Sequence, residues 1–206
     1  VLDKLIAESS EKFILFCSSS SVARTLHSHL LDKFPDKNPL RYEFARDQTE
    51  SDNAFVQFQE DQNVKLIVCD KSSEEGINLQ GLNRNIVHID LPLNPNRIEQ
   101  RIGRVDRFGN SEFNIYALRD LDNDYEKIWY EFLENTLQIF LTSAASLQIL
   151  LEQEMKILHD EFFIKGIDVF HELTKKMHGE EGLINLEKKR INHQDQLNSM
   201  MFIKDD

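Results

Sequence analysis

Several features that mark whole classes of protein are scarce in this chain of 206 residues. Four Pro and seven Gly are too few for a collagen-like or low-complexity chain. The apolar runs reach only about half a dozen residues, against roughly 20 for a membrane-spanning helix, so we expect no membrane partner. The N-terminus shows no basic-then-apolar leader pattern. Because the chain begins at Val1 rather than Met, we expect a piece of a longer protein. We expect that protein to be cytoplasmic.

Cysteine and positive charge are also in short supply. Cys17 and Cys69 each end an apolar run, so we expect buried thiols and no disulfide framework. The 24 basic and 36 acidic residues give a net charge of −12, which argues against a general nucleic-acid coat. Residues 1–120 carry 15 basic and 19 acidic residues, and residues 121–206 carry 9 and 17. A local basic face is therefore compatible with the first part alone.

The apolar pattern predicts an α/β class up to residue 120. Apolar or alternating runs predict five strands, at about 13–17, 40–44, 64–69, 86–89 and 113–118. Helical spacing separates most of them, and the order β-α-β-α-β-β-α-β predicts a parallel β-sheet flanked by helices. Residues 1–120 are therefore expected to form this sheet domain.

Only helical patterns follow, so residues 121–206 are expected to form an all-helical C-terminal extension. Apolar residues from Trp129 to Leu141 recur at helical spacing, which predicts one stripe that faces a core. Gly166 and the segment 179–182 predict helix breaks, and a last helix is expected over about 183–201.

The most informative segment runs from Asp90 to Gly109. Asn94 followed by proline predicts a capped helix start. Within this helix one face carries residues spaced i, i+4 and i+7, namely Gln100, Arg104 and Arg107. Two guanidinium groups a turn apart suit a polyphosphate, because their forked donors match phosphate oxygens.

The rest of this helix fits the same interpretation. About 200° away lie the apolar residues expected to grip the sheet, Ile98, Ile102 and Val105. Gly103 keeps the surface beside Arg104 low enough for a ligand to approach. The alternative is an exposed basic helix whose arginines pair with Glu99 and Asp106.

A second element lies earlier, at residues 66–80, where a buried strand leads into a loop containing Gly76. Open α/β sheets bind ligands beyond the carboxyl ends of their strands, where this loop would lie. One glycine is usually only a turn, but the loop and the helix together indicate a ligand site.

Three motifs resemble the second RecA-like lobe of superfamily-two helicases and translocases of the Swi/Snf type, the bacterial RapA-like translocases in particular. They are SEEGINLQ at 73–80, DLPLNP at 90–95 and QRIGRVDRFG at 100–109, with 13–19 as the opening strand. The resemblance covers about residues 10–120 and implies a RecA-like fold.

In that family two lobes clamp ATP between them, so the resemblance implies the C-terminal half of a DNA-dependent ATPase. It implies that Arg107 is an arginine finger reaching ATP bound by the N-terminal RecA-like lobe, with Arg104 assisting and Gln100 orienting the pair. Such a finger raises the rate of ATP hydrolysis by a factor of roughly 10³–10⁵. The same lobe would hold Mg²⁺.

The resemblance further implies binding residues and partners. The loop residues near the nucleotide would be Glu75, Gly76 and Asn78. Ser18 and Ser19 would touch a DNA phosphate, although a serine there could equally cap the following helix. The implied partners are the N-terminal lobe, duplex DNA and RNA polymerase.

Three departures from the family concern the nucleic-acid side. Asp70 stands where the family has Thr or Ser, Ser73 replaces a common glycine, and residues 44–52 lack the usual Gly and Arg. An aspartate repels a phosphate, so we expect the nucleotide-facing motif to be intact and the track-facing surface to be altered.

Missing motifs limit what the chain does alone. It has no glycine-rich phosphate loop with a following Lys, and no Cys/His cluster or other metal site is expected. We therefore expect this chain by itself not to hydrolyse ATP. Two other hypotheses stay open: a degenerate motor lobe that acts as a protein-interaction scaffold, and an unrelated doubly wound small-molecule enzyme.

Overall fold

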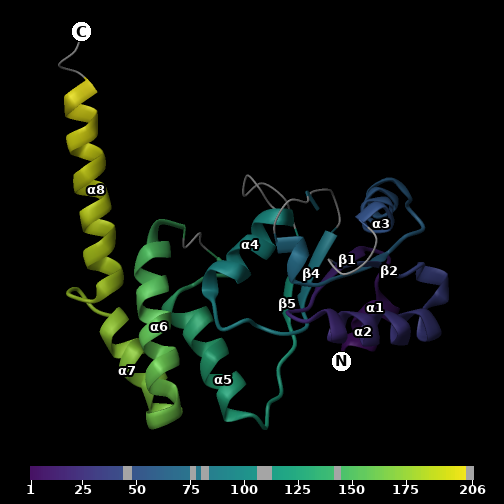
Figure 1. Cartoon of the computed structure of the whole chain (residues 1–206), viewed down its shortest axis with the longest axis horizontal. Helices are drawn as coiled ribbons and strands as arrows, with labels where there is room; N and C mark the ends of the chain where they lie inside the picture. The colour runs from purple at the N-terminus through teal and green to yellow at the C-terminus, as the bar shows by residue number, and fades with distance from the viewer. Residues whose placement is uncertain (44–47, 75–77, 80–83, 106–112, 142–144, 203–206) are drawn as a thin grey trace. The chain divides into compact units, whose positions relative to one another are not determined.

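The computed structural model describes residues 1–43, 48–74, 78–79, 84–105, 113–141 and 145–202 (Figure 1). The elements of the first part are α1 (Leu2–Glu8), β1 (Lys12–Phe16), α2 (Ser20–Lys33), η1 (Pro35–Lys37), β2 (Leu40–Tyr42), α3 (Gln48–Glu60), β3 (Leu66–Cys69), η2 (Lys71–Glu74), β4 (Arg84–His88), α4 (Pro95–Val105) and β5 (Ile115–Ala117). The second part contains α5 (Asp124–Glu131), a π-helical turn (Phe132–Thr136), η4 (Ala145–Leu147), α6 (Gln148–Lys165), α7 (Asp168–Met177) and α8 (Leu183–Phe202).

The five strands form one parallel sheet in the order β2-β3-β1-β4-β5. The predicted α/β class, the parallel sheet and the five strands along the chain are confirmed. The order of the strands within the sheet was not predicted. Helix α1 is an addition that the apolar pattern did not predict.

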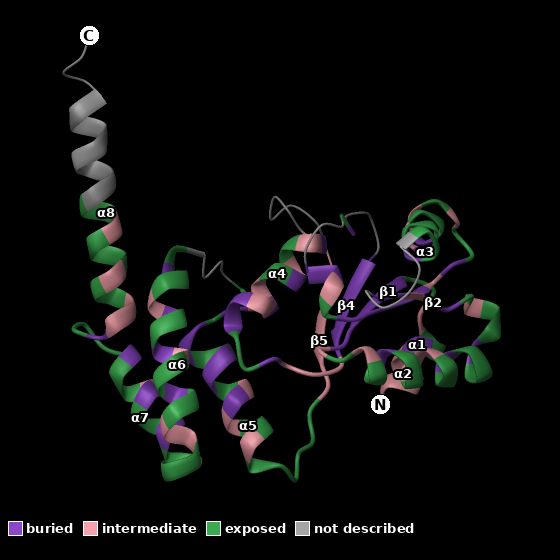
Figure 2. Cartoon of the chain, in the orientation of Figure 1, coloured by how far each residue is buried: buried purple, intermediate pink, exposed green. Residues whose placement is uncertain are grey.

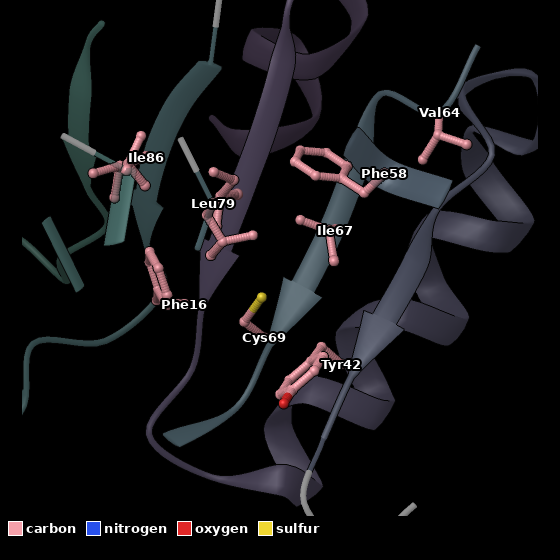
Figure 3. Close-up of a cluster of buried hydrophobic side chains, with 10 residues drawn as sticks. Phe16, Tyr42, Phe58, Val64, Ile67, Cys69, Leu79 and Ile86 are labelled. Atoms are coloured by element: carbon pink, nitrogen blue, oxygen red, sulfur yellow. The ribbon is translucent and has the colours of Figure 1, made fainter. Parts of the chain in front are cut away.

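Helices cover both faces of the sheet. Successive side chains of β1 point to opposite faces and therefore belong to two different hydrophobic cores. Phe13 and Leu15 pack with residues of α1 and α2, while Ile14 and Phe16 pack with residues of α3 and α4. Figure 2 shows β1 and β4 buried along their lengths, and β3 is buried in the same way. Figure 3 shows the second of these cores. Cys17 and Cys69 are free, buried thiols, as predicted.

The helical region differs from its prediction in one respect. The stripe begins as expected, since Trp129, Leu133 and Leu137 are buried. It does not continue, because Gln138 adopts a positive φ of 52° after the π-helical turn and Leu141 is 82% exposed. The prediction that Leu141 faces a core is therefore wrong.

The predicted breaks further along are confirmed. Gly166 and Gly179 both have positive φ, a conformation that glycine adopts without a steric penalty. They separate α6, α7 and α8.

By contacts the chain divides into two compact units, 1–92 with 100–120, and 93–99 with 121–206. The assignment of 1–120 and 121–206 as a lobe and its helical extension stays a prediction. Among the described residues, no helix has both the length and the apolar character needed to cross a membrane.

Candidate functional site

The candidate site lies where three neighbouring strands end. Ser18 follows β1, Asp70 follows β3 and Asp90 follows β4. Strands β1 and β4 are neighbours in the sheet. After β1 the chain runs to β2 on one side of the sheet, and after β4 it runs to β5 on the other side, so the two connections leave in opposite directions. Ligands of open α/β sheets bind beyond the carboxyl ends of strands at such a switch point.

Helix α4 begins with the predicted cap. The Asn94 side chain accepts a hydrogen bond from the backbone N–H of Asn96 at 3.0 Å. Pro95 then opens the helix, at a position where its missing N–H costs nothing.

The two faces of α4 separate as predicted within its described length. Ile98 and Val105 are buried, Gln100 is exposed and Arg104 is half-buried. A Cβ added to Gly103 would meet nothing within 4 Å. The glycine therefore leaves an open surface beside Arg104, at some cost to helix stability.

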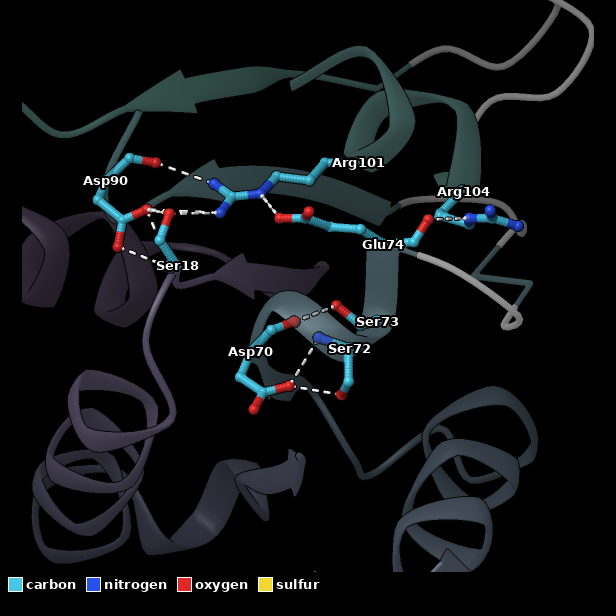
Figure 4. A network of polar contacts seen from close by, with 8 residues as sticks. All are labelled: Ser18, Asp70, Ser72, Ser73, Glu74, Asp90, Arg101 and Arg104. Atoms are coloured by element: carbon cyan, nitrogen blue, oxygen red, sulfur yellow. Dashed lines mark hydrogen bonds and ion pairs between the residues drawn. The ribbon is translucent and has the colours of Figure 1, made fainter. Parts of the chain in front are cut away.

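Arg101, whose role the sequence did not reveal, is the centre of the site and is fully buried. Its Nε donates to Glu74 Oε1 at 2.8 Å, and one Nη donates to the Asp90 carbonyl at 2.9 Å (Figure 4). The other Nη donates to Ser18 Oγ at 2.9 Å and lies 3.4 Å from Asp90 Oδ1. Its Cζ lies 5.7 Å from the centre of the Phe16 ring. A buried guanidinium is stable only when paired in this way.

Ser18 and Asp90 join the ends of β1 and β4 directly. The Ser18 backbone N–H donates to both carboxylate oxygens of Asp90, at 3.0 and 2.8 Å, and its hydroxyl donates to Oδ1. The hydroxyl of Ser18 therefore both donates and accepts within the protein. Ser19 caps α2 by accepting a hydrogen bond from the N–H of Ser21, which is the alternative that the sequence left open.

Helix α4 also holds the residues on both sides of the glycine loop. Arg104 Nε donates to the Glu74 carbonyl at 2.8 Å, and the Arg104 carbonyl accepts from the Leu79 N–H at 2.9 Å. Glu74 and Leu79 precede and follow the segment 75–78 in the sequence, so α4 holds the residue on each side of it.

Asp70 lies inside the protein, with 1% of its surface exposed. Its carboxylate accepts from the hydroxyl of Ser20 and from the N–H and hydroxyl of Ser72. The Ser73 hydroxyl donates to the Asp70 carbonyl at 2.7 Å. This aspartate thus ties β3 to η2 and to the start of α2, and its charge is turned inward.

Two titratable groups beside Arg101 are kept neutral. Burial, helped by the positive charge of Arg101, lowers the pKa of His88 to about 3. Burial, with a contribution from Asp90, raises the pKa of the Cys17 thiol to about 12. Neither group is suited to acid–base chemistry near neutral pH.

The predicted site residues are placed unequally. Gln100 and Arg104 share one side of α4, and Asn78 is exposed. Arg107, Glu75 and Gly76 lie outside the described residues. Among the residues that are described, no group of three or more His, Cys, Asp or Glu side chains could hold a metal ion.

Comparison with known proteins identifies the family. Residues 1–109 match the helicase conserved C-terminal domain. The RNA polymerase-associated protein RapA of Vibrio vulnificus is 34% identical over 139 residues, and that of Vibrio cholerae is 32% identical over 142. These alignments cover 67% and 68% of this chain but only 13% of each relative.

Solved structures share the fold. The C-terminal part of the Fun30 ATPase domain has a TM-score of 0.55 at 23% identity, covering 79% of this chain and 52% of that one. The Mycobacterium smegmatis helicase Lhr has a TM-score of 0.53 at 14% identity, covering 65% and 19%. The predicted RecA-like lobe related to RapA is confirmed, and an unrelated small-molecule enzyme no longer fits. The chain belongs to the family of helicase conserved C-terminal domains.

Proposed function

We propose that this lobe is the C-terminal half of a DNA-dependent ATPase of the Swi/Snf type, which presents an arginine finger to ATP held by an N-terminal RecA-like lobe. The observation that carries the proposal is the buried Arg101 network, which fixes α4 to the carboxyl edge of the sheet. Groups that stabilise a transition state act best when they are held in place before the reaction. Arg101 gives that rigidity to the helix that carries Arg104 and leads towards Arg107.

Each proposed catalytic residue has a distinct role. Arg107 is the finger that neutralises charge developing on the γ-phosphate, a contribution of roughly 10³–10⁵ in rate. Arg104, oriented through its Nε by the Glu74 carbonyl, assists it, and Gln100 orients the pair. The open surface at Gly103 supports the close approach of a ligand.

The cofactor is ATP with Mg²⁺. When bound, it supplies the phosphoryl group that passes to water. The guanidinium and amide groups of α4 suit phosphate oxygens. The described part of this lobe offers no cluster for Mg²⁺, and we place that ion on the N-terminal lobe. Glu75, Gly76 and Asn78 belong to the loop that α4 brackets, and we place them near the nucleotide.

The proposed partners are the N-terminal lobe, duplex DNA and RNA polymerase, in the cytoplasm. Ser19 is exposed at the start of α2, whereas the hydroxyl of Ser18 is already engaged, so Ser19 is the better placed of the two for a DNA phosphate. The relatives named as RNA polymerase-associated support the third partner.

Arg107→Ala tests the finger in a protein that joins this lobe to its N-terminal lobe. We expect ATP turnover to fall by about 10³-fold or more, while ATP affinity changes by less than about threefold. Arg190→Ala, at an exposed arginine of α8, is the matched control and should leave both unchanged. Normal turnover by Arg107→Ala would remove Arg107 from the mechanism.

A second candidate is a degenerate motor lobe that serves as a scaffold. It is favoured by the acidic helical part, which has 17 acidic against 9 basic residues in 121–206. Asp70 gives it little support, because that carboxylate is buried among serine donors rather than exposed to repel DNA. A scaffold would show no DNA-dependent turnover in the two-lobe protein.

A further inference from the structure

A hollow lies at the opposite edge of the same sheet, where the strands begin. It has a volume of about 560 Å³ and is lined by Ser10, Glu11, Lys12, Gln59, Gln62, Lys65 and Arg84. Lys12 opens β1, Arg84 opens β4 and Lys65 immediately precedes β3. Three adjacent strands therefore each bring a cation to this pocket.

These cations form a row across the sheet. Lys12 and Arg84 are register partners, and the Lys65 carbonyl accepts from the residue after Lys12, at 2.8 Å. Lys12 and Arg84 are only 5% and 6% exposed. Burial, and then the charges of Arg84 and Lys65, lower the pKa of Lys12. Like charges side by side in a sheet destabilise it, so this row is a local conflict.

Backbone carbonyl groups accept hydrogen bonds from two of these cations but do not cancel their charge. Lys12 Nζ donates to the carbonyls of Phe58 and Asp61, at the end of α3, and one Nη of Arg84 donates to the Leu79 carbonyl. Both cations also lie over the Phe58 ring, at 5.0 and 5.4 Å. Among the described residues, Arg84 Nε is buried without a hydrogen-bond partner.

Carboxylates compensate the row only in part. Asp61 attracts Lys12 more weakly than the two neighbouring cations repel it. Glu11 accepts a hydrogen bond from the Asn85 amide. The pocket thus holds three cations against one lining carboxylate, in a chain whose net charge is −12.

We propose that this pocket, at the amino edge of the sheet, binds a small, multiply charged phosphate anion of the pyrophosphate type. All seven lining residues are polar, so the pocket has neither the apolar anchors of a peptide site nor an accessible aromatic face for a base. Its volume falls in the range of small-molecule sites. A bound anion would offset the charge that the protein leaves uncompensated, and half-buried Lys65 is its first contact.

Calorimetric titration of the 206-residue chain with sodium pyrophosphate, in Mg²⁺-free buffer, tests this site. We expect one anion per chain, with binding that weakens as salt is added. Lys65→Gln should weaken it about tenfold, because it removes one charge at the pocket mouth. Lys175→Gln, at an exposed lysine of α7, makes the same charge change elsewhere and should bind like the wild type.

Arg104→Gln separates this site from the proposed nucleotide-facing edge, and it should leave pyrophosphate binding unchanged. The proposal is overturned if no heat of binding appears, if Lys65→Gln and Lys175→Gln behave alike, or if Arg104→Gln abolishes binding. It is also overturned if a short DNA duplex binds through Lys65 while pyrophosphate does not.

Discussion

The two ends of β1 and β4 bury positive charge in different ways. At the carboxyl end, Arg101 lies over Phe16 and is paired with the side chains of Glu74 and Asp90. At the amino end, Lys12 and Arg84 lie over Phe58 and donate to backbone carbonyls.

The carboxyl end is a structural contact, whereas the amino end is the proposed binding site. At the carboxyl end, ion pairs and hydrogen bonds within the protein already satisfy the Arg101 guanidinium, so this end does not require an added anion and serves to position α4. The amino end retains uncompensated charge, which a ligand can offset. Burial of a cation alone therefore does not distinguish a positioning role from a binding one; its partners do.

The largest effect should come from breaking the carboxyl-end joint. Arg101→Met would leave the carboxylates of Glu74 and Asp90 without their buried counter-charge, so we expect the free energy of unfolding to fall by about 3–5 kcal/mol. Arg104→Met, on the half-buried side of the same helix, should cost less than half as much. Urea unfolding followed by circular dichroism measures both.

The single tryptophan provides an internal reference for this comparison. Trp129 lies in the helical unit, so its fluorescence reports that unit, while circular dichroism reports the whole chain. Equal losses of stability in the two variants would show that the pairing of Arg101 is not what holds this edge.

A pH dependence should follow from His88, which stacks on the Phe16 ring and whose charged form is disfavoured by burial and by Arg101. Its pKa is about 3 when folded and near 6.5 when unfolded, so between these values the unfolded chain binds the extra proton. Stability is therefore complete above pH 6.5 and is lost as the pH falls towards 3, by about 3 kcal/mol between pH 6.5 and 4.

Urea unfolding of the wild type and of His88→Gln across this pH range isolates the contribution. The variant carries no titrating group at this position, so its stability should fall less steeply. Parallel slopes for the two proteins would assign the acid sensitivity to other groups.

A smaller loss is expected at Asp70. Asp70→Ala would leave the hydroxyls of Ser20 and Ser72 without their acceptor, at a cost of about 2 kcal/mol. Asp70→Asn keeps an acceptor and should cost less. The midpoint of thermal unfolding checks both variants, and an unchanged midpoint in Asp70→Ala would mean that these contacts contribute nothing to stability.

The sequence predicted the strands and helices better than it predicted the Arg101 contacts that join α4 to the ends of β1, β3 and β4. Alternating and continuous apolar runs identify β1, β3 and β4, because burial on both faces leaves a local pattern. Arg101 lies on the same face of α4 as the apolar residues Ile98 and Val105. A charged residue on an apolar helix face is the one sequence feature that could have indicated its buried role. Its meaning depends on Glu74 and Ser18, which are 27 and 83 residues away along the chain.

The same limit applies to Asp70 and to the helical region. As a departure from a family motif, Asp70 predicted a repulsive surface, but its serine partners turn the carboxylate inward. In the helical part, spacing alone extended the stripe to Leu141, whereas the backbone of Gln138 ends it. The spacing of apolar residues along the chain does not reveal the backbone conformation of a single residue or the contacts of residues far apart in the sequence.

The most direct test of the motor hypothesis is ATP turnover by the two-lobe protein with and without duplex DNA, beside its Arg104→Ala variant. In our proposal the carboxyl edge acts on ATP bound by the other lobe, so we expect duplex DNA to stimulate the wild type and Arg104→Ala to lose most of that turnover. Turnover that ignores DNA, or that survives in Arg104→Ala, would contradict the proposal and favour the scaffold.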